Sequence, residues 1–540
     1  EHVFDRLFEA LALPDWGGFS DAELVERVAA CERLAARVAA HQAGAAGELA
    51  QRRTGELDTP QARWHTDAWA ATAAELSVAM GVGQRRASRW MHIGIALRER
   101  LPRIAGLLAD GRISPETAAV ICWATRLLVD TDILAAVDAE LAGYAARFGT
   151  LSVEQLKRRI GEVVARHDPD ACQSWRQQAR GRMARFRFFR DGSGLAGVYS
   201  IMWATDAQAL QRRTETVAGT VCPDDPRTVE QRRADALGAI GAGRNALACA
   251  CQDPHCPAKT NPAARCTNVT ITVVAEPATV TTPRQRRIHG KKPGEAGAGD
   301  GDAVTVPPAE PAAGVPPADP ETTPPHPENP EPHPAVVPSP HRAPARAVLM
   351  GGHVLPAWLV AELVDAGAHV KPLKPPGLQP EPHYRPSPAL AAYVRARDLT
   401  CRFFGCQVPA DRCDIDHLIP WPAGPTHPAN LACLCRAHHL LKTFYPGWRP
   451  TPHPDGVIEW TSPAGQTFTT HPGSHLLLPG ADTHTPLPPG HRLATPPEPG
   501  PNHTLAMPRR HQPRAITHQR RIMAERAHNK AHRTQTGKPP

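Results

Sequence analysis

The sequence lacks two features that would place the chain in or across a membrane. It has no run of about 18 apolar residues, the length that a membrane-spanning helix needs. Its first residues form neither the basic segment nor the apolar core of a secretory signal. We therefore expect a cytoplasmic protein without a membrane partner.

Acidic residues are almost absent from the C-terminal end. Residues 501–540 contain seven Arg and two Lys against one acid, Glu525, so they carry a formal charge of +8. The whole chain also sums to +8, which leaves the preceding residues neutral in sum. We expect a basic disordered tail over residues 476–540 that contacts nucleic-acid phosphates loosely. A merely solubilising tail is the alternative.

Proline, by contrast, is abundant and unevenly distributed. Of the 59 prolines, 15 lie between Pro307 and Pro344. Such a stretch buries too little apolar surface to offset the entropy lost when it becomes ordered. Residues 283–346 are therefore predicted to be a disordered, Pro-rich linker.

With 540 residues, the chain exceeds a single core and is predicted to be an α+β multidomain protein. Residues 1–282 should form a mainly α-helical domain with a small β element, and residues 347–475 a small C-terminal module with its core at 397–445. Helix-cap signals in the front domain occur at Ser114 and Ser152.

The spacing of apolar residues changes along the front domain. Near the N-terminus they recur every three or four residues, which predicts a helix with one buried stripe that includes Cys31. The members of that stripe are Leu24, Val28, Cys31, Ala35 and Val38. Around residues 184–202, Phe and Arg alternate and predict a β-hairpin, and a further strand is expected over residues 269–273.

Residues 75–90 have two interpretations. A helical segment ends in a glycine turn at Gly81, and Arg85, Arg86 and Arg89 follow it. In a DNA-binding helix-turn-helix, these arginines would contact phosphates or base edges. The interpretation that we favour is an ordinary helical hairpin with a solvated basic face.

Cysteine is clustered. Nine of the 13 cysteines fall in two local groups, a pattern that favours metal sites over disulfides in an unsecreted chain. The first group could bind a second structural zinc ion, with His255 as a substitute ligand, although one residue between two ligands is a tight spacing. It consists of Cys249, Cys251, Cys256 and Cys266. A loop of unpaired cysteines is the alternative.

The second group combines with a histidine further along the chain. Cys401 and Cys406 form one short pair, and Cys435 and His438 form another, which is the grouping of a tetrahedral zinc site. Zinc would stabilise a module that is too small to have much core. The neighbouring Cys413 and Cys433 are expected outside the metal shell, because four better-spaced ligands already exist.

Hard and basic groups lie between and beside these pairs: Asp416, His417, Asn430 and His439. His417 is the predicted general base for water, since an imidazole titrates near neutral pH. Asp416, which faces the other side of a strand, and His439 are predicted to hold a divalent cation, Mg²⁺ or Mn²⁺. Asp414 is an alternative to Asp416. Lys442, three residues past His439, is predicted to contact a phosphate.

The segment from Arg397 to Thr443 resembles the HNH endonucleases with the ββα-metal fold. The wider chain resembles actinobacterial HNH-signature proteins, in which a long helical domain of unknown function comes first. Three residues depart from the usual pattern: Phe404 and Pro425 stand where proline and glycine are usual, and Cys433 where an apolar residue is usual. None of these changes removes one of the chemical groups named above.

The resemblance implies a metal-dependent endonuclease that hydrolyses phosphodiester bonds in nucleic acid, with double-stranded DNA as the expected substrate. It also implies that Asn430 orients His417 or braces its loop. An alternative from another class is a catalytically inactive, zinc-dependent nucleic-acid-binding protein. Nicking of plasmid DNA with Mg²⁺ or Mn²⁺ and its suppression by EDTA would separate the two.

Overall fold

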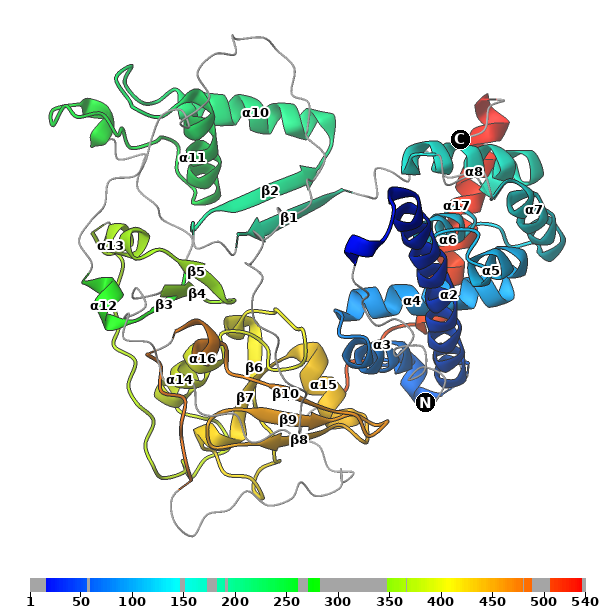
Figure 1. Ribbon diagram of the computed structural model, residues 1–540. Coiled ribbons are helices and arrows are strands. Elements are labelled where there is room, and N and C mark those ends of the chain that lie inside the picture. Colours follow the sequence, from blue (N-terminus) through cyan, green and yellow to red (C-terminus); the bar gives the residue numbers. More distant parts are fainter. Residues whose placement is uncertain are drawn as a thin grey trace. The chain divides into compact units, whose positions relative to one another are not determined.

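The computed structural model is mostly helical with small sheets (Figure 1). It describes residues 16–55, 59–145, 151–171, 182–189, 193–260, 271–281, 347–365, 367–478, 480–487 and 506–536. The predicted linker and Cys266 lie outside these residues. The chain divides into two compact units. The first comprises Glu1–Trp203, Thr272–Thr281 and Arg346–Pro540, and the second comprises Ala204–Ile271 and Thr282–Ala345.

The front of the first unit is helical, as predicted. Its helices are α2 (Asp21–Thr54), α3 (Ala68–Ala79), α4 (Gln84–Glu99), α5 (Pro102–Ala109), α6 (Pro115–Ala124), α7 (Thr131–Tyr144) and α8 (Val153–His167). Both predicted caps are confirmed: Ser114 accepts a hydrogen bond from the first turn of α6, and Ser152 forms a capping box with Gln155. Fully buried Leu101, Ile104 and Leu141 contribute to a continuous apolar core. Among the described helices, none is both long and apolar enough to cross a membrane.

The buried face of α2 differs from the predicted stripe. Val28 is 66% exposed and Cys31 is also exposed, so the prediction that they lie in the core is wrong. The buried residues of α2 are Ala36, Ala39, Ala43, Ala46, Gly47 and Ala50. A Cβ added at Gly94 of α4 would lie 1.9 Å from the carbonyl oxygen of Ala43. The close approach of two helices therefore selects small residues for burial, and larger apolar residues remain outside the contact.

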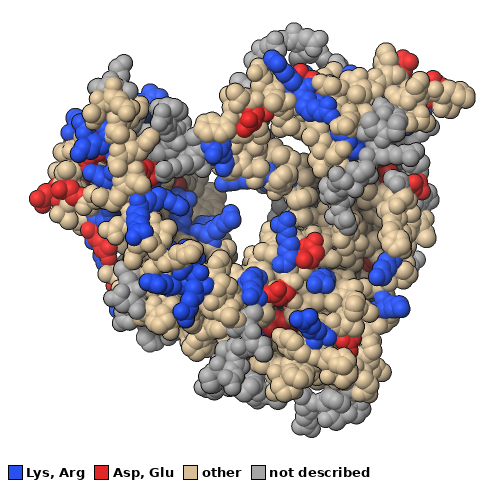
Figure 2. Space-filling model, turned by 180° about the vertical axis from the view of Figure 1, so that it is seen from behind, with Lys and Arg blue, Asp and Glu red and all other residues tan. Residues whose placement is uncertain are grey.

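Helices α3 and α4 are joined by a turn at Gly81 with φ +62°, as both interpretations of residues 75–90 predict. Arg85, Arg86 and Arg89 are exposed on α4. Lys and Arg side chains gather over the helical part of the first unit in the view of Figure 2. Whether these arginines touch nucleic acid stays a prediction.

The C-terminal end contains a helix where a disordered tail was expected. Helix α17 (Arg514–Thr536) lies against the front helices: Arg526 Nη1 is 2.6 Å from Asp168 Oδ2 and 2.9 Å from the Leu127 carbonyl oxygen. Arg533 donates to the Asp170 carboxylate, and Asn529 donates to the Asp170 carbonyl oxygen. Composition alone suggested disorder, but the buried or half-buried carboxylates of Asp168 and Asp170, just after α8, pair with arginines of α17 and order this helix.

Arg526→Ala is expected to destabilise the helical part of the first unit, because it leaves the 6% exposed Asp168 without its cation. Removal of one partner of a buried pair costs roughly 3 kcal/mol or more. Hydrogen exchange of the α8 amides should therefore accelerate on the mutation. Arg520→Ala, on an exposed position of the same helix, is the matched control and should change the free energy of opening by less than about 0.5 kcal/mol. Equal protection in the two variants would contradict the role given to Arg526.

The predicted hairpin in the front domain is confirmed as β1 (Met183–Phe188) and β2 (Ala196–Ile201), which pair antiparallel. Of the strand expected at residues 269–273, residues 269 and 270 lie outside the described residues, and the described part contributes only Val273, the first residue of β3 (Val273–Ala275). Strand β3 pairs with β4 (Ala347–Leu349), which pairs with β5 (His353–Leu355), beside α12 (Pro277–Val280) and α13 (Ala357–Asp365). The predicted front domain ending at residue 282 therefore shares a sheet with the C-terminal segment, because three-residue strands need partners to bury side chains such as Val348.

The C-terminal module contains a two-stranded sheet followed by a helix. Strands β6 (Cys413–His417) and β7 (Leu431–Cys435) are antiparallel, and α15 (Arg436–Phe444) follows directly. Helix α14 (Pro388–Asp398) precedes them, and a three-stranded sheet of order β10-β9-β8 follows α15. These strands are β8 (Arg449–Pro452), β9 (Ile458–Thr461) and β10 (Thr467–Thr470), and α16 (Gly473–Leu477) comes next.

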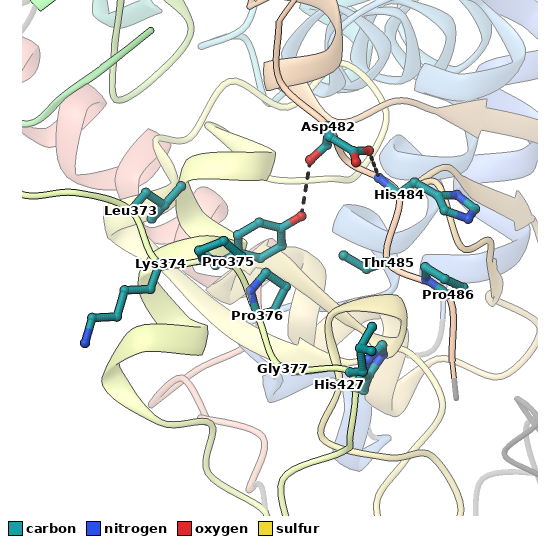
Figure 3. Close-up of a pocket in the computed structure, with 12 residues that line it drawn as sticks. Leu373, Lys374, Pro375, Pro376, Gly377, His427, Asp482, His484, Thr485 and Pro486 are labelled. Atoms are coloured by element: carbon teal, nitrogen blue, oxygen red, sulfur yellow. Dashed lines mark hydrogen bonds between the residues drawn. The ribbon is translucent and has the colours of Figure 1, made fainter. Parts of the chain in front are cut away.

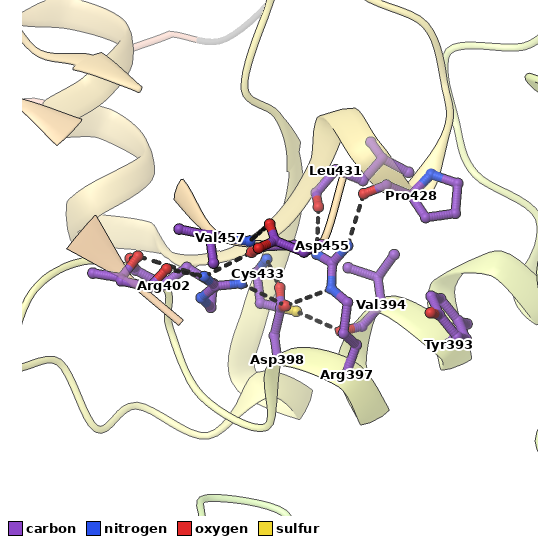
Figure 4. A network of polar contacts seen from close by, with 12 residues as sticks. Tyr393, Val394, Arg397, Asp398, Arg402, Pro428, Leu431, Cys433, Asp455 and Val457 are labelled. Atoms are coloured by element: carbon purple, nitrogen blue, oxygen red, sulfur yellow. Dashed lines mark hydrogen bonds and ion pairs between the residues drawn. The ribbon is translucent and has the colours of Figure 1, made fainter. Parts of the chain in front are cut away.

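A buried group of charges connects these elements (Figure 4). Asp398, at the end of α14, accepts hydrogen bonds from Arg397 at 2.8 Å, Arg402 at 3.0 Å and the Cys433 amide of β7 at 2.8 Å. Burial raises the pKa of the Asp398 carboxyl, but the two arginine charges outweigh burial and lower it on balance. Arg397 also donates to the Leu431 carbonyl oxygen at 2.6 Å. The network therefore fixes β7 against α14, and β7 carries part of the site described below.

Candidate functional site

The four predicted zinc ligands lie together in the structure. The ligand atoms of Cys401, Cys406, Cys435 and His438 are all within 4.8 Å of one another. Cys435 Sγ lies 4.0 Å from Cys406 Sγ and 3.2 Å from His438 Nδ1. Two sulfurs bound to one tetrahedral ion at about 2.3 Å are about 3.8 Å apart. The cluster therefore fits a single ion and could hold a structural metal.

Local structure explains how these ligands meet. Cys401 and Cys406 lie on the loop after α14, whereas Cys435 caps α15 and His438 lies in its first turn. The His438 ring stacks on Phe403 at 4.1 Å, which fixes the imidazole plane. Hydrogen bonds from the thiols of Cys401 and Cys406 lower the pKa of Cys435.

Two further cysteines lie near this cluster but do not belong to it. Cys413 donates to the carbonyl oxygen of Pro409 at 3.3 Å, and Cys433 Sγ lies 3.9 Å from that of Val394. Phe404, which departs from the usual pattern, packs edge-on against Phe468 of β10 at 5.6 Å. Phenylalanine at this position thus adds an aromatic contact between the loop that carries Cys401 and Cys406 and the three-stranded sheet.

A second cluster, of carboxylates and basic groups, forms where β6 faces α15. His439 Nε2 is 3.3 Å from Asp416 Oδ1, and Nδ1 is 2.9 Å from Asp414 Oδ2. Burial raises the pKa of Asp416, but the charges of Lys442 and His439 outweigh it and lower that pKa on balance. Burial lowers the pKa of His439, but its two aspartate partners raise it on balance. Both aspartates predicted as alternative cation ligands therefore lie beside His439.

Lys442 has a different partner from the predicted phosphate. Its Nζ lies 2.6 Å from Asp416 Oδ2 and 2.5 Å from the His417 carbonyl oxygen, and only 8% of its side chain is exposed. Helical geometry put Lys442 on the same face as His439, as expected. The sequence did not indicate that β6 would present a buried carboxylate to that face.

The ring of His417, which neighbours Asp416 on β6, makes separate contacts. Its Nε2 is 2.9 Å from Thr426 Oγ1, and the ring stacks on Tyr384 at 5.2 Å. Thr426 donates its hydroxyl proton to the His383 carbonyl oxygen at 2.6 Å, so it accepts from His417. Nε2 therefore carries the proton, and Nδ1 has the lone pair.

Burial lowers the pKa of His417 to about 4, with Asp416 opposing this effect and Lys442 adding to it. The imidazole is thus neutral at pH 7 and can accept a proton through Nδ1. Thr426 and Tyr384 were not identified from the sequence. Tyr384 lies before the segment from Arg397 to Thr443, and Thr426 lies within it but is uncharged, so spacing gave no signal for either residue.

Asn430 braces the loop that follows His417. Its amide oxygen accepts from the Ile419 amide at 2.9 Å, and its amide nitrogen donates to the carbonyl oxygens of Ile419 and Pro425 at 3.0 and 3.1 Å. A Cβ at Gly424 would lie 2.4 Å from the Asn430 amide nitrogen, so this position requires glycine. Of the two roles considered for Asn430, these contacts are those of a loop brace.

A cavity of about 340 Å³ lies elsewhere in the module (Figure 3). Its wall includes Tyr393, His427 and Asp482, and the Tyr393 hydroxyl donates to the Asp482 carbonyl oxygen at 3.5 Å. Neither Asp416 nor His439 lines it. The cavity is therefore separate from both clusters.

The second unit contains the other predicted cysteine group, in altered form. Cys249, Cys251 and Cys256 come together with Cys222, and these four could hold a second structural metal. The predicted fourth ligand, Cys266, lies outside the described residues. Cys222 was missed because it precedes Cys249 by 27 residues and a helix separates them.

Comparisons with known proteins identify relatives of uncharacterized function. The chain is 42% identical over 522 residues to the uncharacterized protein Rv3776 of Mycobacterium tuberculosis H37Rv, which covers 96% of this chain and 92% of the relative. Uncharacterized protein Rv2100 of the same strain is also 42% identical over 522 residues, covering 96% and 90%. An uncharacterized M. tuberculosis protein in the est 3' region is 36% identical over 374 residues, covering 69% and 95%.

No solved structure matches the chain significantly. A family model described as a domain of unknown function, DUF222, matches residues 25–300. That match takes in half of the chain, and two of the relatives align with nearly all of it. The chain therefore belongs to the DUF222 family.

Proposed function

We propose that this chain is a metal-dependent HNH endonuclease that hydrolyses phosphodiester bonds in nucleic acid, with double-stranded DNA as its substrate. The observation that carries the proposal is the meeting of Asp416 and His439, 3.3 Å apart, with the neutral imidazole of His417 on the next residue of β6. A carboxylate and an imidazole at this separation can hold a divalent cation. The imidazole of His417 can take a proton from water.

Each residue has a separate task in this proposal. His417 Nδ1 accepts the proton of the attacking water, while Thr426 fixes the ring through Nε2. Asp416 and His439 hold a cation, Mg²⁺ or Mn²⁺, which when bound stabilises charge on the scissile phosphate. Asn430 keeps the loop of His417 in place. The Cys401 cluster holds zinc, which joins the metal loop to α15.

One observation favours a second function, that of a zinc-dependent nucleic-acid-binding protein without turnover. The ammonium of Lys442, 2.6 Å from Asp416 Oδ2, already neutralises the carboxylate that would hold the cation. With Oδ2 held by Lys442, Asp416 offers a cation only Oδ1, the oxygen that faces His439. If this single oxygen binds the cation too weakly, the protein binds nucleic acid without hydrolysing it.

A plasmid assay separates the two functions. Purified full-length protein is incubated with supercoiled DNA in Mg²⁺ or Mn²⁺, with a parallel sample in EDTA, and single-stranded DNA and RNA as further substrates. Nicked or linear plasmid with the metals and intact plasmid with EDTA would support the nuclease. Retarded but uncut nucleic acid under all conditions would support binding alone.

Asp416→Ala and His439→Ala are expected to raise the Mg²⁺ concentration at half-maximal cleavage at least about 10-fold, because each removes a group that holds the cation. High Mg²⁺ should partly restore their rates. Asp411→Ala removes an exposed carboxylate from the turn before β6 and serves as the control, with an unchanged metal dependence. A loss of rate in Asp416→Ala with unchanged Mg²⁺ dependence would argue against Asp416 as a cation ligand.

A further inference from the structure

The cysteines of the second unit form a compact group in the loops that follow helices α10 (Ala204–Ala218) and α11 (Val229–Gly241). The sulfurs of Cys222, Cys249, Cys251 and Cys256 are all within 4.8 Å of one another, and Cys222 Sγ is 3.4 Å from Cys249 Sγ. We infer that these four thiolates bind a second structural zinc ion, with Cys222 rather than Cys266 as the fourth ligand.

The mutual spacing of the sulfurs favours one shared ion over disulfides. A disulfide joins two sulfurs at about 2.05 Å and does not require a second pair of cysteines to lie nearby. Here all four sulfurs lie near one another, as around a tetrahedral ion, whose sulfurs are about 3.8 Å apart. Cys249, Cys251 and Cys256 are buried, which suits a closed structural site.

A buried ion pair holds the peptide on both sides of Cys249. Arg227 donates to both carboxylate oxygens of Asp225, at 2.8 and 2.7 Å, just after Cys222 in the chain. Arg227 also donates to the Ala248 carbonyl oxygen at 2.8 Å, and Asp225 accepts from the Ala250 amide at 2.9 Å. Two segments that are distant in sequence are thus aligned by groups outside the cluster, and Cys222 is brought to Cys249.

The small core beside this group explains why an ion would be needed. The buried apolar residues packed between α10 and α11 are Val217, Ala218, Ala236, Ala239 and Leu247. Three are alanines, each of which buries little apolar area. A thiolate-bound ion joins the end of α10 to the loop after α11 and supplies stability that such a core lacks.

The test is the zinc content of the purified full-length chain, measured by elemental analysis per mole of protein. Wild type is expected to hold about two zinc ions, one in each cluster. Cys222→Ser and Cys435→Ser should each hold about one. Cys266→Ser and the control Cys31→Ser, at an exposed position of α2, should keep two. The measurement is independent of cleavage, so it is decided separately from the proposed function.

Three results would overturn the inference: one zinc in wild type that Cys435→Ser removes, loss of a zinc in Cys266→Ser but not in Cys222→Ser, or iron in place of zinc. If Cys222→Ser does not accumulate as soluble protein, the zinc contents of Cys435→Ser and Cys266→Ser test the inference. One zinc remaining in Cys435→Ser and two in Cys266→Ser would support the site. In Co²⁺-substituted Cys435→Ser, intense thiolate-to-cobalt absorption would report the four-thiolate site alone.

Discussion

His417→Ala is expected to lower the rate of phosphodiester cleavage by about 10²–10⁴-fold, which is what a positioned general base contributes. The zinc content, the fold and the affinity for nucleic acid should stay near those of wild type. The physical reason is that the His417 ring contacts Thr426 and Tyr384 and lies outside the Cys401 cluster. In the proposed function, affinity for nucleic acid would rest mainly on phosphate contacts by basic side chains elsewhere.

Single-turnover cleavage of plasmid, followed with saturating Mg²⁺, measures this effect. His471→Ala removes an exposed imidazole near the end of β10 and serves as the control, with a rate near that of wild type. Thr426→Val should lower the rate less than His417→Ala, because it frees the ring without removing the base. A wild-type rate in His417→Ala would show that another group activates the water.

Cys435→Ser is expected to unfold the C-terminal module, not only to inactivate it. Zinc bound by thiolates contributes about 10 kcal/mol or more in small zinc peptides, more than the core of so small a module can replace. Trp448 and Trp460 pack edge-on against Phe403 beside the metal cluster, so their fluorescence reports the module's folding. A red-shifted emission and the loss of one zinc per chain are the expected readouts.

Cys413→Ser is the matched control, because Cys413 is also buried in β6 but binds the Pro409 carbonyl oxygen, a contact that a serine hydroxyl can keep. It should retain the native emission and the full zinc content. Native fluorescence in Cys435→Ser, together with unchanged zinc, would remove Cys435 from the metal site and with it the structural role of the cluster.

The sequence by itself determined those parts of the molecule that depend on neighbours within a few residues. The caps at Ser114 and Ser152 and the hairpin of β1 and β2 follow from local hydrogen bonding and periodicity. The pairs Cys401/Cys406 and Cys435/His438 were also readable, since ligands on one loop or one helical turn have a fixed spacing.

Tertiary structure alone decided what each of these elements meets. Close packing of α2 on α4 buries alanines and leaves Val28 exposed, although periodicity favoured the larger residues. Helix α17 is ordered by acidic groups at Asp168 and Asp170, more than 340 residues earlier in the chain. Amino-acid composition does not indicate which distant residues will pair in the folded chain.

The same limit applies at the Asp416 carboxylate and at the cysteine group of the second unit. Lys442 turns to Asp416 because β6 and α15 pack face to face, and Cys222 reaches Cys249 because Asp225 and Arg227 align two distant segments. Burial and charge at these sites depend on contacts between helices and strands that are distant in the sequence. Such contacts exist only in the folded chain, where low polarity strengthens them. Residue type and spacing therefore indicated which kinds of side chain could act as ligands. The fold decided which of these side chains lie together in one site.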